Sequence, residues 1–339
     1  MRPEDPAVAA RVVVPPPPTP TLFVVVDTEE EFDWSAPFSR ARTSVSAMRH
    51  IGRAQAIFDR FGIVPTYVVD FPVASQPEGV APLQAFAADR RATVGAHLHP
   101  WVTPPFEEEL GRSNSFACNL PAALERAKLT ALSDTIGEAF GARPTVYKAG
   151  RYGLGARTLP MLAALGIDID TSVNPHMDYS AEGGPDFRAF DARPRWIGRD
   201  RLLEIPCTTG FAGLAGRTPG ARLHALAVSS PWAQLRAPGV LARAGLLNRI
   251  MLSPEGSRLE EMVLLTKALL RQGVRTFTLS FHSPSVAPGH TPYVRTAADL
   301  EGFLRALERY FEFFFAELGG VASTPRAFRG ALEAPAEPH

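Results

Sequence analysis

A regular alternation of apolar runs with helical patterns constrains the fold of this chain more than any other feature of its sequence. The run TLFVVVD, Thr21 to Asp27, is apolar between its first residue and its closing acid. Uninterrupted apolar runs are typical of strands buried on both faces, as in parallel sheets. Strands that alternate with helices form parallel βαβ units, so the sequence predicts a barrel-like α/β fold. Further strands are expected at 63–70, 92–99, 144–150, 166–173, 201–206 and 275–282.

Helices are predicted between these runs, and two late helices carry start signals. Ser257 with Glu260, and Thr296 with Asp299, have the three-residue spacing of a capping box, which satisfies free backbone N–H groups at a helix start. They precede the run MVLLTKALLRQG and a run that extends to Leu318. The earlier helices are expected at 44–61, 81–91, 121–140 and 156–165.

Composition along the chain predicts three parts. Residues 1–20 form a proline-rich leader, residues 21–322 form the barrel domain, and residues 323–339 are expected to be a loose tail. An insertion is predicted around 174–254. Its first part is rich in Pro, Gly, Asp and Arg without periodicity, and 211–254 is weakly patterned. Long excursions of this kind in compact domains often serve function.

Charge and cysteine content exclude several classes of protein. The 35 Lys and Arg residues balance the 35 Asp and Glu residues without long runs of one sign, so a nucleic-acid tail is not indicated. Cys118 and Cys207 stand far apart, which excludes a zinc knuckle and a disulfide framework. The chain has no uncharged apolar stretch long enough for a membrane span and no signal-like leader. We therefore expect a soluble, cytoplasmic protein of undetermined oligomeric state.

Polar residues follow the ends of several predicted strands. In a parallel α/β barrel the carboxyl ends of the strands surround one cavity, so polar side chains there are candidates for catalysis. Acids, histidines and an arginine are therefore expected to converge. The stretches that carry them are VVVDTEEEFDW, VGAHLHP, YKAGRYG, DIDTSVNP and LSFHSPS.

The first of these stretches offers a pair of carboxylates. Alternate residues of an extended segment share a face, so Asp27 and Glu29 can point together. One could bind a cation while the other accepts a proton from water. The alternative interpretation is that Glu29, Glu30 and Glu31 form a solvated charge cluster before a turn.

The same spacing places His97 and His99 on one face, with Leu98 between them. Two imidazoles and one carboxylate suit zinc and leave a coordination position open for water, as catalytic metal sites require. Alternatively, one histidine is buried and satisfied by a backbone carbonyl. Trp101, which follows Pro100, could form a wall for a sugar or simply pack in the core.

Three further residues are candidates with open roles. His282 could protonate a leaving amine if a carboxylate holds its tautomer, or it could be a core histidine. Arg151 could pair with Asp27 and keep that carboxylate ionised, or it could lie on the surface at a turn. Asp170 could orient a catalytic imidazole, or cap a loop with the two hydroxyl residues that follow it.

This ordered set of motifs resembles the metal-dependent polysaccharide deacetylase family, the carbohydrate esterases that include chitin and peptidoglycan deacetylases. The resemblance extends from about Leu22 to Ser285. It implies a distorted (β/α) barrel, one divalent metal, usually zinc, and removal of acetyl groups from N-acetylated sugars. It also implies roles for individual residues: Asp27 as general base, Glu29, His97 and His99 as metal ligands, Arg151 and Asp170 as the third-motif and fourth-motif residues, His282 as general acid, and the Tyr152 backbone amide as an oxyanion donor.

The sequence departs from the family pattern at two positions. The family's second motif has two histidines separated by three residues, whereas position 101 is Trp, so we expect His99 to replace the missing ligand. The usual proline of the third motif is absent beside Arg151.

Three functions compete on this evidence. The first is a metal-dependent hydrolase that removes an N-acetyl group from a saccharide or glycan precursor. The second is a catalytically inactive, deacetylase-like carbohydrate-binding protein, because the histidine spacing is broken. The third is a different metal hydrolase, since H-x-H also occurs in amidohydrolases, although there it normally follows the first strand and here it follows the third.

Overall fold

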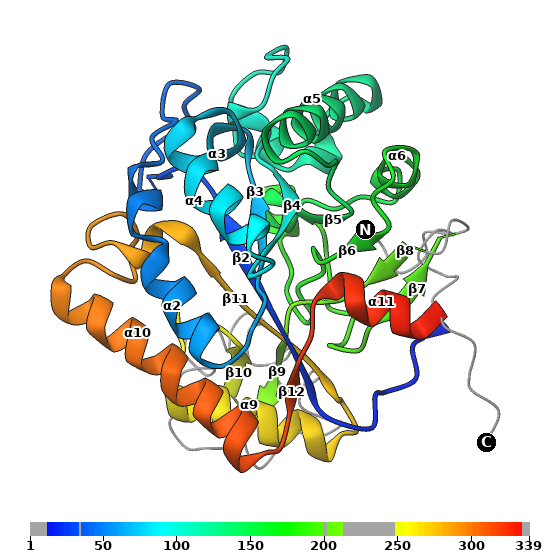
Figure 1. Cartoon of the computed structure of the whole chain (residues 1–339). Helices are drawn as coiled ribbons and strands as arrows, with labels where there is room; N and C mark the ends of the chain where they lie inside the picture. The colour runs from blue at the N-terminus through cyan, green and yellow to red at the C-terminus, as the bar shows by residue number, and fades with distance from the viewer. Residues whose placement is uncertain (1–11, 34, 199–201, 213–247, 334–339) are drawn as a thin grey trace, which may run out of the picture.

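A sheet of ten strands forms the centre of the computed structural model, which describes residues 12–33, 35–198, 202–212 and 248–333 (Figure 1). Neighbouring strands follow the order β1-β7-β8-β6-β5-β4-β3-β2-β11, and β12 also pairs with β2. The series from β8 to β11 is parallel throughout. The strands are β1 Val12–Val13, β2 Thr21–Thr28, β3 Thr66–Val69, β4 Thr93–Leu98, β5 Val146–Ala149, β6 Ile169–Asp170, β7 Arg195–Ile197, β8 Leu202–Glu204, β11 Thr276–His282 and β12 Val321–Ala322.

A separate two-stranded sheet fills the space between the two ends of this parallel series. It consists of β9 Thr209–Ala212 and β10 Asn248–Met251, which are antiparallel. Thr278 on β11 donates its N–H to the hydroxyl of Thr208, and Ser280 donates its N–H to the carbonyl of Leu252. On the other side, Cys207 donates its N–H to the Val173 carbonyl. Among the described residues no ladder joins β8 directly to β11, so the barrel is closed by these contacts and is distorted.

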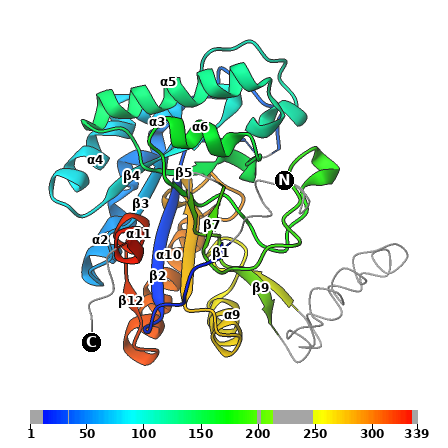
Figure 2. The same cartoon turned by 90° about the vertical axis from the view of Figure 1, so that its right-hand side faces the viewer.

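Helices surround the outer face of the sheet. Figure 1 shows α2 and α10 packed side by side, and Figure 2 shows the adjacent strands β2 and β11 running through the middle of the molecule. The predicted α/β barrel is confirmed. The helices are α2 Gly52–Arg60, α3 Phe71–Ser75, α4 Pro77–Ala88, α5 Ala122–Phe140, α6 Thr158–Ala164, α9 Leu259–Arg271, α10 Ala297–Glu312 and α11 Pro325–Glu333.

The alternation of side chains along β2 determines which residues reach the interior. All eight residues of β2 are buried, as the apolar run predicts. Val24 and Val26 belong to the large core formed with the helices, whereas Phe23 and Val25 belong to a smaller cluster inside the barrel. Asp27 continues the inward-facing set because side chains two residues apart share a face.

One expectation about the ends of the chain needs correction, and part of the leader pairs with the sheet. Residues 325–333 were expected to be loose, but they form α11, whose Phe328 packs edge-on against Phe23 at 5.3 Å between ring centroids. In the leader, β1 pairs with β7 and Val14 is buried. Residues 1–11, 213–247 and 334–339 lie outside the described ranges, and the division into three parts stays a prediction.

One helix start is predicted correctly and the other is displaced by one residue. Thr296 accepts the N–H of Asp299 and closes the expected capping box of α10. The expected Ser257–Glu260 box is wrong. Arg258 occupies the cap position of α9 and donates its N–H to Glu261, while the Ser257 hydroxyl donates to the Met251 carbonyl. In the described ranges no helix is both long and apolar enough to cross a membrane.

Candidate functional site

A cavity of about 450 Å³ opens where the parallel strands end. Its walls come from the ends of β2, β4, β5 and β11 and from the loops that follow them. Most of the site residues predicted from sequence line this cavity, and Asp170 is the exception. Those that line it are Asp27, Glu29, His97, His99, Trp101, Arg151, Tyr152 and His282.

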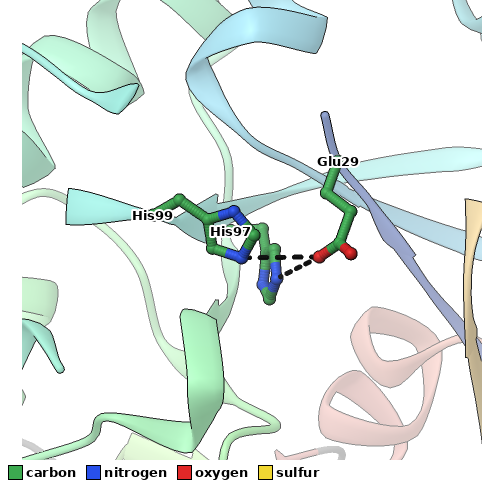
Figure 3. A group of neighbouring side chains, drawn as sticks. All are labelled: Glu29, His97 and His99. Carbon is green, nitrogen blue, oxygen red and sulfur yellow. Dashed lines mark ion pairs between the residues drawn. The ribbon is translucent and has the colours of Figure 1, made fainter. Parts of the chain in front are cut away.

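Glu29, His97 and His99 converge on one point of the cavity wall (Figure 3). The Glu29 Oε2 atom lies 3.4 Å from the Nε2 atom of each histidine, and the three side chains are only 3–5% exposed. His97 Nδ1 lies 2.9 Å from the Lys148 carbonyl, which can only accept a hydrogen bond, so Nδ1 carries the proton. The Nε2 atom of His97 therefore presents a lone pair to Glu29.

This arrangement fits a divalent cation. His99 Nδ1 lies 2.8 Å from a carboxylate oxygen of Glu30, which leaves its Nε2 atom free to act as a ligand in the same way. A carboxylate oxygen and two lone-pair nitrogens, all within 4.8 Å of one another and buried, form an electron-rich group that a cation would stabilise. In the alternative interpretation, a backbone carbonyl satisfies a buried histidine. This accounts for the Nδ1 atom of His97 but not for its Nε2 atom, which faces Glu29.

Glycine at position 150 makes room for the His99 ring. A Cβ atom at this position would lie 2.3 Å from His99 Cδ2 and 2.5 Å from the Leu98 carbonyl oxygen. Neither a ring carbon nor a backbone oxygen can retreat easily from such a contact. Glycine in the AGRYG stretch is therefore required by His99, which follows the neighbouring strand β4.

The acid cluster interpretation is wrong for two of the three glutamates. Glu29 and Glu30 are buried, and only Glu31 is partly exposed. Burial raises the pKa of Glu30 to about 7. Burial also raises the pKa of Asp70 well above its usual value, and Asp70 accepts the backbone N–H of Glu30. The sequence offered no signal for this role of Glu30, because a run of acids before a turn is usually solvated.

Lys148 rather than Arg151 pairs with Asp27. The Lys148 Nζ atom lies 2.7 Å from both carboxylate oxygens of Asp27, and both side chains are buried. Burial opposes ionisation of Asp27, but the positive charges of Lys148 and His282 outweigh it and lower the pKa of Asp27. The predicted Arg151–Asp27 pair is therefore wrong. Lysine at position 148 faces inward because it lies two residues after the inward-facing Val146 of β5.

Arg151 instead holds the outer wall of the cavity. Its guanidinium group pairs with Glu182 and donates to the Ser115 hydroxyl. It also lies 4.4 Å from the ring centroid of Phe116 and 5.4 Å from that of Phe38. Arg151 has a φ of 51°, so the turn after β5 directs the side chain away from the strand. Neither predicted role, as partner of Asp27 or as a simple surface residue, describes this position.

His282 lies beside Asp27, and Glu255 holds it there. Its Nε2 atom is 3.9 Å from Asp27 Oδ2, and its Nδ1 atom is 2.7 Å from Glu255 Oε2. Although burial disfavours the charged imidazole, Glu255 and Glu29 raise the pKa of His282 to about 10. Glu255 was missed because it lies just beyond the weakly patterned 211–254 segment, where no periodicity indicates which side chains face inward.

Asp170 binds the residues that follow it and the carboxyl group of Glu204. Its carboxylate accepts hydrogen bonds from the N–H and the hydroxyl of Ser172, at 3.0 and 2.6 Å. Ser172 in turn accepts the backbone N–H of Ala149, the residue after Lys148. These contacts with Ser172 match the loop-capping alternative, and the orientation of an imidazole by Asp170 stays a prediction.

Trp101 and Tyr152 line the cavity in different ways. Trp101 is 3% exposed, stacks on His99 at 4.2 Å between ring centroids, and donates Nε1–H to Glu30. These contacts favour the packing alternative over a sugar-binding wall. Tyr152 is partly exposed and stacks on Tyr179 at 5.3 Å.

Comparison with known proteins yields matches among solved structures alone. No protein-family model matches the sequence, and no curated protein matches it. A provisionally assigned polysaccharide deacetylase from Mycobacterium smegmatis is 15% identical, with a TM-score of 0.50 and coverage of 96% of this chain and 97% of that chain.

Two further structures are similar over most of this chain. A provisionally assigned polysaccharide deacetylase from Pseudomonas aeruginosa PAO1 is 16% identical, with a TM-score of 0.49 and coverage of 95% of this chain and 96% of that chain. A CE4 family pseudoenzyme from Bacillus anthracis is 8% identical, with a TM-score of 0.41 and coverage of 90% and 64%. The match to the Mycobacterium smegmatis structure, with its TM-score of 0.50, shows that the fold is that of the polysaccharide deacetylases, as the resemblance implies.

Proposed function

We propose that this protein is a metal-dependent hydrolase that removes an N-acetyl group from a saccharide or glycan precursor. The observation that carries the proposal is the convergence of Glu29, His97 and His99 on one buried point, directly beside Asp27 and His282. A metal-ligand set next to an acid–base pair in one cavity is the equipment that amide hydrolysis requires. The fold shared with polysaccharide deacetylases agrees with this chemistry and does not identify the sugar.

Glu29, His97 and His99 would hold the metal, and zinc suits this donor set. When bound, the cation supplies Lewis-acid polarisation of the acyl carbonyl and lowers the pKa of a neighbouring water. Asp27, kept ionised by Lys148, accepts the proton of the attacking water.

His282 then donates its proton to the departing amine. Glu255 accepts the Nδ1–H of the imidazolium, so the transferable proton is on Nε2, which faces Asp27 and the cavity. The backbone amide of Tyr152 is the proposed oxyanion donor. The products are acetate and a free amino sugar, and placement of the reaction in the cytoplasm is part of the same proposal.

The test is acetate release by the zinc-loaded protein from N-acetylated oligosaccharides, with Asp27→Asn as the decisive variant. Removing the base should abolish release, by about 10²–10⁴-fold, while zinc content stays at one equivalent. A fully active Asp27→Asn protein would refute the assignment of the base.

Zinc content also tests the inactive carbohydrate-binding alternative. The displaced histidine spacing motivates that alternative, since position 101 is Trp. Purified protein that holds less than about a tenth of an equivalent after zinc supplementation would favour it, because a preformed catalytic site binds its metal tightly.

A further inference from the structure

We propose that Glu30 is a positioning residue that fixes the tautomer of His99, and that Trp101 is the reason why only a carboxylate can do so at this position. The inference rests on the proposed function, in which His99 binds the metal through Nε2. It extends that proposal to two residues that do not themselves bind the metal.

The Glu30 carboxylate contacts two ring N–H groups and the carboxyl group of Asp70. Its Oε2 atom lies 2.8 Å from His99 Nδ1, and its Oε1 atom lies 2.7 Å from Trp101 Nε1. Glu30 is fully buried, and its backbone N–H is held by Asp70 Oδ2 at 2.8 Å. Each oxygen of this carboxylate therefore accepts one ring N–H.

The chemistry of the two rings determines what Glu30 must do. An indole N–H can only donate, so the oxygen that faces Trp101 must accept. A neutral imidazole has one N–H, and donation from Nδ1 to Glu30 leaves the lone pair on Nε2, which lies 3.4 Å from Glu29 Oε2. Only a group that accepts at both oxygens satisfies both rings with His99 in the tautomer that can bind a metal.

The surroundings leave His99 little opportunity to find another partner. Asp70 Oδ2 is 4.0 Å from His99 Nδ1, which is beyond hydrogen-bond distance. The His99 ring stacks on Trp101 at an interplanar angle of 24°, and Gly150 lies against its other edge. The ring is thus confined, and its protonation pattern depends on Glu30.

Glutamine at position 30 should therefore invert the tautomer. Its amide oxygen must face Trp101, so its NH₂ group would face His99 Nδ1. That atom would then accept, and the proton would move to Nε2 and point at Glu29. In Glu30→Gln/Trp101→Phe no indole N–H remains, so the amide can rotate, present its oxygen to His99 and restore the Nδ1–H tautomer.

Two measurements test this inference, one of them without metal. Imidazole ¹⁵N spectra of the metal-free protein, assigned by loss of the His99 signals in His99→Gln, should show Nδ1–H in the wild type. They should show Nε2–H in Glu30→Gln and Nδ1–H again in the double variant. Zinc affinity, measured by competition with a chromophoric chelator, should fall about 10–100-fold in Glu30→Gln and recover in the double variant.

Trp101→Phe is the first control and should keep the wild-type tautomer. Glu31→Gln is the second control: it makes the same change one residue later, in a side chain that binds Ser44 and Ser46, and it should also keep the wild-type tautomer. A Glu30→Gln protein that keeps Nδ1–H, or a double variant that fails to recover, would overturn the inference. If the tautomers change across the variants as expected but the wild type binds no zinc, the proposed function would instead be overturned.

Discussion

The two sides of the cavity differ in how far apart in the chain their interacting residues lie. On the metal side, His97, His99 and Trp101 lie within five residues, and Glu29 and Glu30 are adjacent. The acid–base side contains Asp27, Lys148, Glu255 and His282, and these residues come from separate segments of the chain. Asp27 and Lys148, for example, lie 121 residues apart. The metal side joins two short segments whose side chains are arranged by local periodicity, whereas the acid–base side gathers single residues from four separate segments.

Replacing Lys148 should have the largest effect on stability and activity, and it should disturb the acid–base side of the cavity more than the metal side. Lys148→Met leaves Asp27 buried without its counter-charge, so we expect about 3–5 kcal/mol of lost unfolding free energy. Activity should fall by about 10²–10⁴-fold because the base is disturbed. Chemical denaturation and acetate release measure these effects.

Zinc content sharpens this experiment, since Glu29, His97 and His99 keep their contacts in the variant. Near-stoichiometric zinc in a folded but inactive Lys148→Met protein would separate the two sides. Loss of zinc together with activity would mean that they form one unit.

Gly150→Ala should affect the metal side first. The added methyl group would meet His99 at 2.3 Å, so the ring must move away from Glu29. Because ligand geometry is shifted, we expect about a 10–100-fold loss of zinc affinity, measured by chelator competition. Gly153→Ala is a useful comparison, because a Cβ atom there would meet backbone atoms of Phe116 and Ala117 at 3.0 Å and no metal ligand. Equal zinc loss in both variants would contradict the specific contact with His99.

Glu255→Gln should change the pH dependence of the acid–base side. Loss of the carboxylate lowers the pKa of His282 from about 10, so the general acid is deprotonated at lower pH. The descending limb of the kcat/KM profile should therefore move to lower pH, while zinc affinity is unchanged. An unmoved limb would show that His282 is not the group that is titrated.

The same shift has a consequence for stability. The pKa of His282 in the folded protein lies above its value in the unfolded chain, which is near 6.5. Protonation of His282 therefore stabilises the fold fully below about pH 6.5, and this stabilisation is lost as the pH rises toward 10. Denaturation of metal-free wild type and Glu255→Gln across pH 6–10 should show the difference between them shrink as the pH increases.

Arg151→Gln should have the smallest effect. Its partner Glu182 and the flanking rings lie on the outer wall, and such partly exposed ion pairs contribute about 0.2–1 kcal/mol. We expect at most about a fivefold rise in KM with kcat and the pH profile nearly unchanged. A large fall in kcat with retained zinc would instead indicate that Arg151, rather than Lys148, acts together with Asp27.

Several strands were readable because burial on both faces leaves an apolar run. β2, β4 and β11 lie where TLFVVVD, ATVGAHLH and RTFTLSFH predict them. The pairing of Glu29 with His97 and His99 follows from period-two alternation plus the rule that parallel strands end at one edge. The helix at 325–333 was missed because contacts with distant segments stabilise it there: Phe328 packs against Phe23, and Arg326 and Arg329 pair with Asp168.

The sequence alone determined the barrel, the edge at which its polar residues gather, and the residues that approach each other through strand periodicity. Only the tertiary structure decided that Lys148 rather than Arg151 faces Asp27, that Glu255 holds His282, and that Glu30 is buried. The physical reason is the same in each case. Several side chains of like charge lie near each strand end, and the direction in which the backbone turns there determines which of them enters the cavity. Arg151, with its positive φ, is an example. That direction is set by packing between segments far apart in the chain.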